Sequence, residues 1–465
     1  MTFDKINLGN QIRVDGPNGT YSEYTYHPTR NWLTSLVNRK SDDTVLSSFD
    51  YTYDNVGNRL TVTEHDGSVV SYDYDDIYQL TSETRTGSSA YSISYTYDNV
   101  GNRLTMTKNS ITTDYTYNDN NQLITETIDS DTTTLYTYDD NGNLIQKTDG
   151  SNTTNYTWDW RNMLTSVSDS SDTTTYAYDG DGNRIQKTEI RGQTTETTKY
   201  INDVASPLVQ VLFETDDTGD TILATYNYGN DLISMNRGGT VSYYQYDGLG
   251  STRQLTDENE AVVASYTYDS FGNLIATSGA TTNAYGFTGE QQFGEGDGLV
   301  FLRARYYDSR VGRFLSRDPI GYLGGINLYA YVGNDPTNSI DPAGVLKIVG
   351  SWPSESPRSC AERIKDDVAK TPGEAADPSA RKLHCIASCR ISRECVGGKF
   401  TAWIAGDWFQ DPWWQGPPKS NSDPCDRKAN EVGRDVSGDK GKSCGQACQD
   451  AFNKGQIPTG KKCCP

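Results

Sequence analysis

A tyrosine-rich motif, Y-x-Y followed by Asp or Asn, recurs along the chain and constrains its fold more than any other feature. Typical copies read YTYDNVGNRLT from Tyr51 and YTYDDNGNLI from Tyr136. From Tyr53 to Tyr178, the second aromatic positions of successive copies are separated by 21, 23, 20, 21, 20 and 20 residues. A fixed period of this length predicts a repeat architecture. The eight copies begin at Tyr51, Tyr72, Tyr95, Tyr115, Tyr136, Tyr156, Tyr176 and Tyr266.

Each copy predicts a β-hairpin. Two aromatic residues separated by one position leave the same face of a strand. The Asp, Asn and Gly that follow are residues that tolerate positive φ in tight turns. An apolar residue, Leu60, Leu104 or Leu144, is then expected to open a second strand. Because threonines between the copies also favour strands, successive hairpins are expected to form one long, coiling antiparallel sheet.

The tyrosines of the motif have two interpretations. Their positions are locked to the repeat, which favours rings that pack the sheet, each with a hydroxyl that needs a hydrogen-bond partner. The alternative is a row of rings that stacks against sugars, as in a carbohydrate-binding platform. The first interpretation predicts buried rings and the second predicts exposed ones.

Cysteine, tyrosine and charge usage all change near Gly344. All 9 cysteines lie between Cys360 and Cys464, and all 32 tyrosines precede residue 345. Of 41 Lys and Arg and 62 Asp and Glu residues, 19 and 15 fall in 345–465, so 1–344 holds 22 against 47 and a formal charge of −25. We therefore place a domain boundary near Gly344. The acidic first part argues against nucleic acid or an anionic membrane as its partner.

The N-terminal sequence, MTFDKINLGNQIRVDG, lacks the charged and apolar regions of a signal peptide. No apolar run approaches the roughly 18–20 residues that span a bilayer. Either export uses another route, or the chain is the end of a longer ancestral protein. We expect a secreted or cell-surface location.

A segment of different character, residues 285–344, follows the repeats. It contains RARYYDSRVGRFLSRDPIG, GGINLYAYVGNDP and DPAG. These stretches resemble the Rhs-associated core, and the repeats resemble the YD repeats of Rhs proteins, toxin-complex C subunits and the teneurin shell. The resemblance covers about residues 20–344. It implies a mainly β fold: a YD-repeat β-shell (1–284), here a partial cocoon because few repeats are present, then the core (285–344) and a variable C-terminal tip (345–465).

The resemblance also implies that the core cuts its own chain. Three Asp-Pro pairs occur within 25 residues, at Asp318, Asp335 and Asp341. In the family an aspartate pair in this segment is an autoprotease that releases the tip just after a DPxG-Leu motif. By resemblance, Asp318 and Asp335 form this pair and Arg317 shapes the local field.

The chemistry is plausible because two close carboxyls cannot both ionise, so one acts as base while the other keeps a proton. The cut is expected near Val345, which stands where the family has leucine and is followed by Leu346. The alternative is that the Asp-Pro pairs are only turn formers.

The tip is expected to be a small, mainly α, cysteine-rich domain. Two cysteine pairs have i, i+4 spacing, so each pair lies on one face of a predicted helix. Disulfides between two such helices are expected in a small secreted domain. Zinc binding by these cysteines with His384 is the alternative, although the spacing is wider than that of usual ligand pairs. The cysteines are Cys385, Cys389, Cys444 and Cys448.

Catalytic residues in the tip are candidates only, because no known motif contains them. An acid, base or nucleophile is available from His384, Asp407, Asp426 and Asn430, or from a thiolate. A structural role for His384, the one histidine of the tip, is the alternative. We expect no cofactor.

Three functions are compatible with the sequence. The first is a polymorphic toxin, in which a β-shell encloses a self-released effector used in competition between bacteria. Its partners would be an immunity protein and either a secretion apparatus or an N-terminal shell partner. The second is a cell-surface adhesive protein that binds glycans. The third is a degenerate orphan fragment.

Overall fold

The computed structural model describes residues 3–5, 11–206, 208–293, 298–345 and 347–349. The chain divides into two units, Met1–Pro353 and Ser354–Pro465, and every described residue belongs to the first. The predicted helices, disulfides and catalytic candidates of the tip lie outside the described residues.

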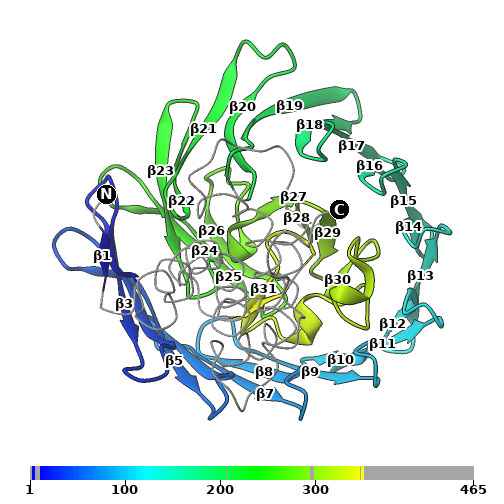
Figure 1. The fold of residues 1–465 in the computed structure, drawn as a ribbon, viewed down its shortest axis with the longest axis horizontal. Coiled ribbons are helices and arrows are strands. Elements are labelled where there is room, and N and C mark those ends of the chain that lie inside the picture. Colours follow the sequence, from blue (N-terminus) through cyan, green and yellow to red (C-terminus); the bar gives the residue numbers. More distant parts are fainter. Residues whose placement is uncertain (1–2, 6–10, 207, 294–297, 346, 350–465) are drawn as a thin grey trace, which may run out of the picture. The chain divides into compact units, whose positions relative to one another are not determined.

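One antiparallel sheet of 26 strands makes up most of the described residues. Each strand pairs with the next along the chain, from β1 to β26. Figure 1 shows these strands following one another around a ring, with β27 to β31 inside it. The mainly β fold with a long antiparallel sheet is confirmed.

The bounds of the strands in the sheet are β1 Phe3–Lys5, β2 Gln11–Asp15, β3 Tyr21–Tyr26, β4 Leu33–Arg39, β5 Val45–Tyr53, β6 Arg59–Glu64, β7 Val69–Tyr74, β8 Leu80–Thr86, β9 Tyr91–Tyr97, β10 Arg103–Lys108, β11 Ile111–Tyr117, β12 Leu123–Ile128, β13 Thr132–Tyr138, β14 Leu144–Asp149, β15 Asn152–Trp158, β16 Leu164–Ser168, β17 Asp172–Tyr178, β18 Arg184–Arg191, β19 Thr194–Asp203, β20 Gln210–Thr215, β21 Ile222–Tyr228, β22 Leu232–Arg237, β23 Thr240–Tyr246, β24 Thr252–Thr256, β25 Val262–Tyr268 and β26 Leu274–Gly279. The inner elements are η1 Phe287–Gly289, β27 Gln291–Phe293, β28 Leu299–Leu302, β29 Arg305–Asp308, β30 Arg313–Phe314, η2 Gly321–Leu323, η3 Val332–Asn334, β31 Ser339–Ile340 and β32 Ile348–Val349.

The aspartate after each Y-x-Y organises the turn of its hairpin. Asp54 Oδ1 accepts hydrogen bonds from the backbone N–H groups of Val56, Gly57 and Asn58 at 2.7–2.9 Å, and Oδ2 accepts one from Asn58 Nδ2 at 2.8 Å. Gly57 has φ 104°, a conformation that suits glycine. The predicted turn chemistry is confirmed, and it explains why Asp follows the tyrosines.

The two tyrosines of the motif have different tasks. The first is buried in six of the eight copies, as at Tyr51 and Tyr115, and half-buried at Tyr72 and Tyr266. The second reaches the preceding hairpin with its hydroxyl. Tyr117 OH donates to the Arg103 carbonyl at 2.8 Å, and Tyr178 OH donates to the Leu164 carbonyl at 2.7 Å. The prediction that the first rings pack the interior is confirmed, so these rings offer no faces for stacking against sugars.

The prediction that Leu60 and Leu104 open the second strand is wrong by one position. Arg59 and Arg103 open β6 and β10 and are buried, whereas both leucines are exposed. The Arg103 guanidinium lies 4.7 Å from the centroid of the Tyr95 ring, where the ring face attracts a cation. At Leu144 the leucine itself is buried, whereas Leu274 of the last copy is exposed.

The sheet coils back on itself, so that strands far apart in the sequence lie side by side. Gly248 N donates to Tyr51 OH at 2.8 Å, and Asn38 Nδ2 donates to the Tyr246 carbonyl at 3.0 Å. We call this contact between β4–β8 and the β23–β25 region the seam.

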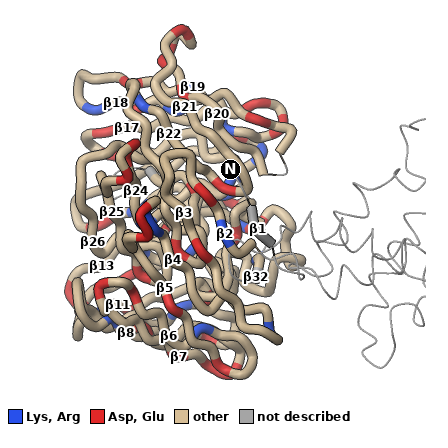
Figure 2. Tube along the Cα trace, turned by 90° about the vertical axis from the view of Figure 1, so that its left-hand side faces the viewer, with Lys and Arg blue, Asp and Glu red and all other residues tan. Residues whose placement is uncertain are grey.

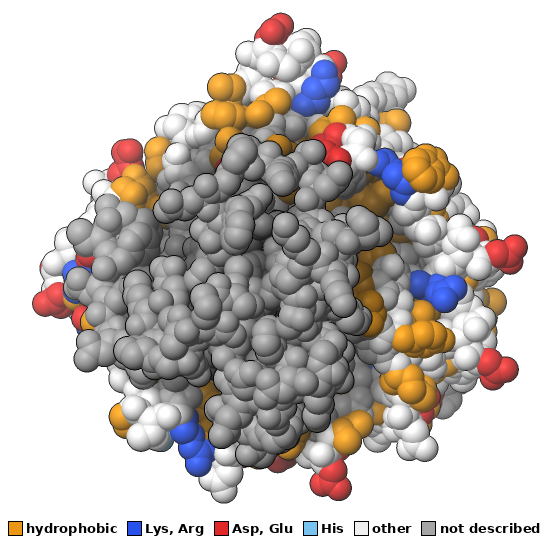
Figure 3. Space-filling model, in the orientation of Figure 1, with side chains coloured by type: hydrophobic (Ala, Val, Ile, Leu, Met, Phe, Trp, Pro, Cys, Tyr) orange, Lys and Arg blue, Asp and Glu red, His pale blue; other side chains and the backbone are white. Residues whose placement is uncertain are grey.

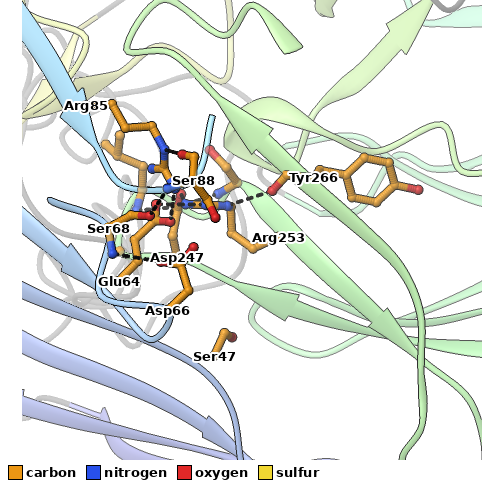
Figure 4. A network of polar contacts seen from close by, with 12 residues as sticks. Ser47, Glu64, Asp66, Ser68, Arg85, Ser88, Asp247, Arg253 and Tyr266 are labelled. Carbon is orange, nitrogen blue, oxygen red and sulfur yellow. Dashed lines mark hydrogen bonds and ion pairs between the residues drawn. The ribbon is translucent and has the colours of Figure 1, made fainter. Parts of the chain in front are cut away.

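A buried ion network crosses the seam (Figure 4). Glu64 on β6 contacts Arg85 on β8 at 2.7 Å and Arg253 on β24 at 2.9 Å. Arg253 also contacts Asp247 at 3.4 Å. The two arginines lower the pKa of Glu64 against the effect of burial, which raises it. Loss of one partner from a buried ion pair is strongly destabilising, so the network fixes the register between successive turns of the coil.

Two buried acidic residues, Glu83 and Asp269, lie close together in the same seam. Tyr91 OH donates to Glu83, and Ser270 N donates to Glu83 Oε2 at 3.0 Å. Burial and the neighbouring Asp269 raise the pKa of Glu83 to about 7, although the Tyr91 and Ser270 hydrogen bonds lower it. Burial also raises the pKa of Asp269.

The stability of the shell is therefore expected to fall between pH 4.5 and 8. The folded-state pKa of Glu83 exceeds its ordinary 4.5. The stability that protonated Glu83 contributes to the fold is therefore complete below pH 4.5 and is lost as pH rises through about 7. Glu83→Gln should raise the free energy of unfolding at pH 8 by as much as about 3 kcal/mol and change it little at pH 4.5. Denaturant unfolding at both pH values measures this, with exposed Glu196→Gln as control. An equal effect of Glu83→Gln at both pH values would contradict it. The positive charges of Lys108 and Arg103 also act on this pair, because they lower the pKa of Asp269.

The core segment (285–344) fills the interior with aromatic side chains. Its sheet runs β27-β28-β29-β30, and Tyr306, Tyr307, Tyr329 and Tyr331 are almost completely buried. The Tyr307 and Tyr331 rings stack with centroids 4.2 Å apart. Tyr307 OH donates to the Phe271 carbonyl, in the turn between β25 and β26, at 2.7 Å. The segment is thus joined to the shell by its tyrosines.

The surface of the described part is polar and rich in carboxylates. Figure 2 shows acidic residues on many of the strands and turns. Where side chains are coloured in Figure 3, hydrophobic ones form separate groups between polar and acidic ones. Among the described residues, none of the helices has the length and apolar character to cross a membrane.

Candidate functional site

Arg305, on β29, lies at the centre of a buried polar cluster. Its Nη2 contacts Asp318 Oδ2 at 3.0 Å and Asp341 Oδ2 at 3.4 Å. Nη1 donates to the Leu328 carbonyl at 3.1 Å, and Nε donates to the Gly344 carbonyl. Each of these charged side chains is at least nine-tenths buried. One guanidinium therefore joins two carboxylates and the carbonyl of a peptide bond.

The peptide bond between Gly344 and Val345 is contacted on both sides. Val345 N donates to Asp341 Oδ1 at 3.0 Å, and Gly344 N donates to the Asp341 carbonyl at 3.2 Å. Gly344 has φ 68°, and a Cβ there would lie 2.3 Å from the Leu302 carbonyl oxygen. Only glycine fits this close approach to β28.

A second buried ion pair contacts the same turn. Both carboxylate oxygens of Glu290 accept from Arg303 Nη1 at 2.9 Å. Arg303 also donates to the Pro342 carbonyl and, at 3.3 Å, to the Val209 carbonyl of the shell. Burial raises the pKa of Glu290, whereas Arg303 lowers it. The Asp-Pro-Ala-Gly turn is thus fastened to the shell as well as to the core segment.

The electrostatics of the Arg305 cluster favour one protonated and one ionised carboxyl. Burial raises the pKa of Asp318, and Asp341 adds to this effect, whereas Arg305 and the Ile320 amide oppose it. Burial lowers the pKa of Arg305, and the two carboxylates oppose that change. Since one cation lies between two carboxyls, a proton on Asp318 leaves a neutral cluster of one cation and one anion.

Asp335 lies in a separate cluster of contacts. Its Oδ1 accepts from Asn338 Nδ2 at 2.7 Å. Its Oδ2 accepts from Ser339 Oγ at 3.1 Å and from Lys347 Nζ at 2.9 Å. Asn338 in turn accepts from the backbone N–H of Arg59 at 2.8 Å, which links this cluster to the shell.

The structure thus brings Asp318 together with Asp341. Asp335 lies in the separate cluster with Asn338 and Lys347. Arg317 is exposed, and its side chain passes over Gly142 and near the Tyr329 hydroxyl. The cation that contacts both Asp318 and Asp341 is Arg305. Val345 lies at the site, whereas Leu346 is outside the described residues.

Sequence reasoning missed Arg305 because the chain offers several arginines nearby and spacing does not choose among them. Asp341 was recognised as an Asp-Pro residue but was left out of the predicted pair. Its position four residues before Val345 is the signal that could have included it.

The fold and this core together define a YD-repeat shell protein of the Rhs type. Residues 70–337, more than half of the chain, match the family model described as "Teneurin YD-shell". The chain belongs to this family, and the predicted resemblance is confirmed.

Similar proteins include one named as a nuclease and one named as a toxin. The chain is 35% identical over 156 residues to the tRNA3(Ser)-specific nuclease WapA of Bacillus spizizenii, a match that covers 32% of this chain and 6% of that protein. It is 33% identical over 115 residues to the toxin protein Tse5 of Pseudomonas aeruginosa, which covers 24% of this chain and 9% of that protein. The chain therefore spans less than a tenth of the length of these relatives.

Solved structures share the shell fold. The TcdB2-TccC3 structure superposes with a TM-score of 0.61 over 74% of this chain and 20% of that one, at 22% sequence identity. This similarity concerns the fold of the described residues.

Proposed function

We propose that this chain is part of an Rhs-type polymorphic toxin in which the shell (1–284) carries a core (285–344) that cuts the chain and frees the tip (345–465). The observation that carries this proposal is the Arg305 cluster. In it Arg305 and Asp341 contact the Gly344–Val345 peptide bond, and buried Asp318 contacts the same Arg305 guanidinium. Family membership, the nuclease name of WapA and the toxin name of Tse5 support the toxin role.

The reaction we propose is aspartic hydrolysis of the chain by itself. Ionised Asp341 takes a proton from water, and the resulting hydroxide adds to the carbonyl carbon. Arg305 and protonated Asp318 stabilise the negative charge that develops on the carbonyl oxygen. When the carbon–nitrogen bond breaks, Asp341 passes its proton to the leaving nitrogen, which gives one new carboxyl group and one new amino group.

Two bonds flank Val345, and the proposal includes both. The family resemblance predicts the cut after Val345, so that the tip begins at Leu346. The contacts of Arg305 and Asp341 are made with the preceding bond, between Gly344 and Val345. The mass of the released fragment differs by one valine between the two cases. The alternative prediction is that Asp335 belongs to the catalytic pair and Arg317 shapes the field. Cleavage of the Asp335→Asn variant tests it.

We propose that the freed tip is the effector and acts on a competing bacterium, with a cognate immunity protein in the producer. His384, Asp407, Asp426 and Asn430 are its candidate catalytic residues. Delivery would use a secretion apparatus or a longer shell partner, and the chain would be secreted or exposed at the cell surface. The nuclease name of WapA and the toxin name of Tse5 support an effector role.

Growth of bacteria that produce the chain tests the effector role. Induction of the full chain is expected to lower viability by at least tenfold, whereas a chain that ends at Val345 leaves growth unchanged because it keeps the shell and core without the tip. The full chain with Asp341→Asn should be less toxic than wild type if release is required. Equal growth with the full and the shortened chain would contradict an effector tip.

A further inference from the structure

The peptide bonds beside Val345 lie in the loop of a short hairpin. β31 and β32 pair antiparallel, with Ser339 opposite Val349 and Ile340 opposite Ile348. The loop between them is 341–347. Both ends of the loop are therefore fixed to each other, although the proposed cut lies between them.

An ion pair fixes the tip side of this loop. Lys347 Nζ lies 2.9 Å from Asp335 Oδ2, and the Asp335 side chain is only 6% exposed. Asp335 is oriented independently of the lysine, because Asn338 Nδ2 and Ser339 Oγ donate to its two oxygens. A carboxylate that is already oriented by hydrogen bonds and can accept a further one is a binding site for a cation.

We propose that Asp335 is a positioning residue that binds Lys347 and thereby places the bond to be cut against Arg305, Asp318 and Asp341. The inference rests on the proposed self-cleavage. Asp335 and the β31–β32 pairing fasten the tip side of the loop, while Arg305 and Arg303 fasten the side before the cut. Such double anchoring keeps the carbonyl and the carboxylates in a reactive geometry and removes the entropy of a free loop. A tip with a cationic residue at this position is accordingly the matched substrate of this core.

This role differs from that of a catalytic aspartate. Asp318 and Asp341 contact the same guanidinium, and Asp341 also contacts the Val345 nitrogen. Asp335 instead contacts Asn338, Ser339, Thr337 and Lys347. Asp335 therefore contacts the substrate segment beyond the reacting bond.

A double-mutant cycle tests the inference. The full chain is refolded from denaturant, and the rate at which the shorter fragments appear is followed on denaturing gels. Asp335→Asn and Lys347→Gln are each expected to slow cleavage roughly ten- to hundredfold. The double variant should be no slower than either single variant, because both act through one contact. Lys347→Arg should keep a rate within about threefold of wild type, since a guanidinium can also pair with the carboxylate. The pH profile should stay unchanged.

The inference is overturned if Lys347→Gln cleaves at the wild-type rate, or if the two single effects multiply in the double variant. It is also overturned if Asp335→Asn does not cleave while Lys347→Gln cleaves normally, which is the result for a catalytic Asp335. Exposed Arg191→Gln is the charge control. A wild-type chain that stays whole overturns the proposed self-cleavage, and this inference with it. Cleavage at the wild-type rate in every Lys347 variant overturns the inference alone.

Discussion

Asp341→Asn is expected to leave the purified chain whole. The amide can still accept the hydrogen bond from the Val345 nitrogen, which Asp341 Oδ1 accepts at 3.0 Å, but it cannot take a proton from water. Loss of a general base slows a reaction by about 10²–10⁴-fold, so cleavage that is complete in minutes would take hours to weeks. Denaturing gels of freshly refolded wild type and variant measure the difference.

Two matched variants sharpen this result. Asp318→Ala should also leave the chain whole, because it removes the hydrogen-bond donor that stabilises charge on the carbonyl oxygen. Asp181→Asn, in an exposed hairpin turn, should cleave like wild type. Cleavage of Asp341→Asn at the wild-type rate would exclude Asp341 from the reaction. If Asp318→Ala and Asp335→Asn stayed whole while Asp341→Asn cleaved, the pair predicted from the sequence would be the correct one.

Tyr307→Ala is expected to have the largest effect on stability. The Tyr307 side chain is fully buried, stacks on Tyr331 and donates to the Phe271 carbonyl. Truncation of a buried aromatic residue costs about 3–5 kcal/mol of unfolding free energy. Tyr307→Phe removes the hydrogen bond alone and should cost about 1 kcal/mol, more if the Phe271 carbonyl is left without a donor.

Denaturant unfolding of the Asp341→Asn background measures these effects without interference from cleavage. Tyr322→Ala is the control, since that ring is 77% exposed and should change the free energy of unfolding by less than about 0.5 kcal/mol. If Tyr307→Ala and Tyr322→Ala were equally stable, the core segment would not be packed against the shell as described.

The repeat predicted the shell because its signals are local. Three signals act within one hairpin: the Y-x-Y alternation, an aspartate that accepts hydrogen bonds from the turn N–H groups, and a glycine with positive φ. They can therefore be recognised without knowledge of the rest of the chain. The burial of Arg103 in place of its neighbour Leu104 could not be predicted, for the opposite reason. It depends on the Tyr95 ring and on Phe271, which lies 4.2 Å from the guanidinium and far away in sequence.

The site was predicted less completely than the shell, because it is assembled from contacts of long range. The sequence indicates three Asp-Pro aspartates in the core segment, yet all three precede proline and have turn-forming neighbours. What separates them is the cation that each meets: Arg305 for Asp318 and Asp341, and Lys347 for Asp335. The pairing of β28 with β29 sets the position of Arg305, and no local pattern encodes that position.

The separate contacts of the aspartates suggest a division of labour within the core segment. Arg305 brings the catalytic carboxyls to the bond, Glu290 and Arg303 fasten the turn before it, and Asp335 binds the lysine beyond it. The shell contributes directly to this arrangement, through the Val209 carbonyl and the Arg59 amide. Self-cleavage is therefore expected to require a folded shell.

The intact mass of the wild-type chain, measured over time after refolding, tests the central claim most directly. If the chain cuts itself, we expect the full-length mass to be replaced by two masses whose sum equals that of the chain plus one water. The smaller fragment should begin at Val345 or Leu346. A single, unchanged full-length mass under native conditions would contradict it, and would leave the three aspartates with a structural role.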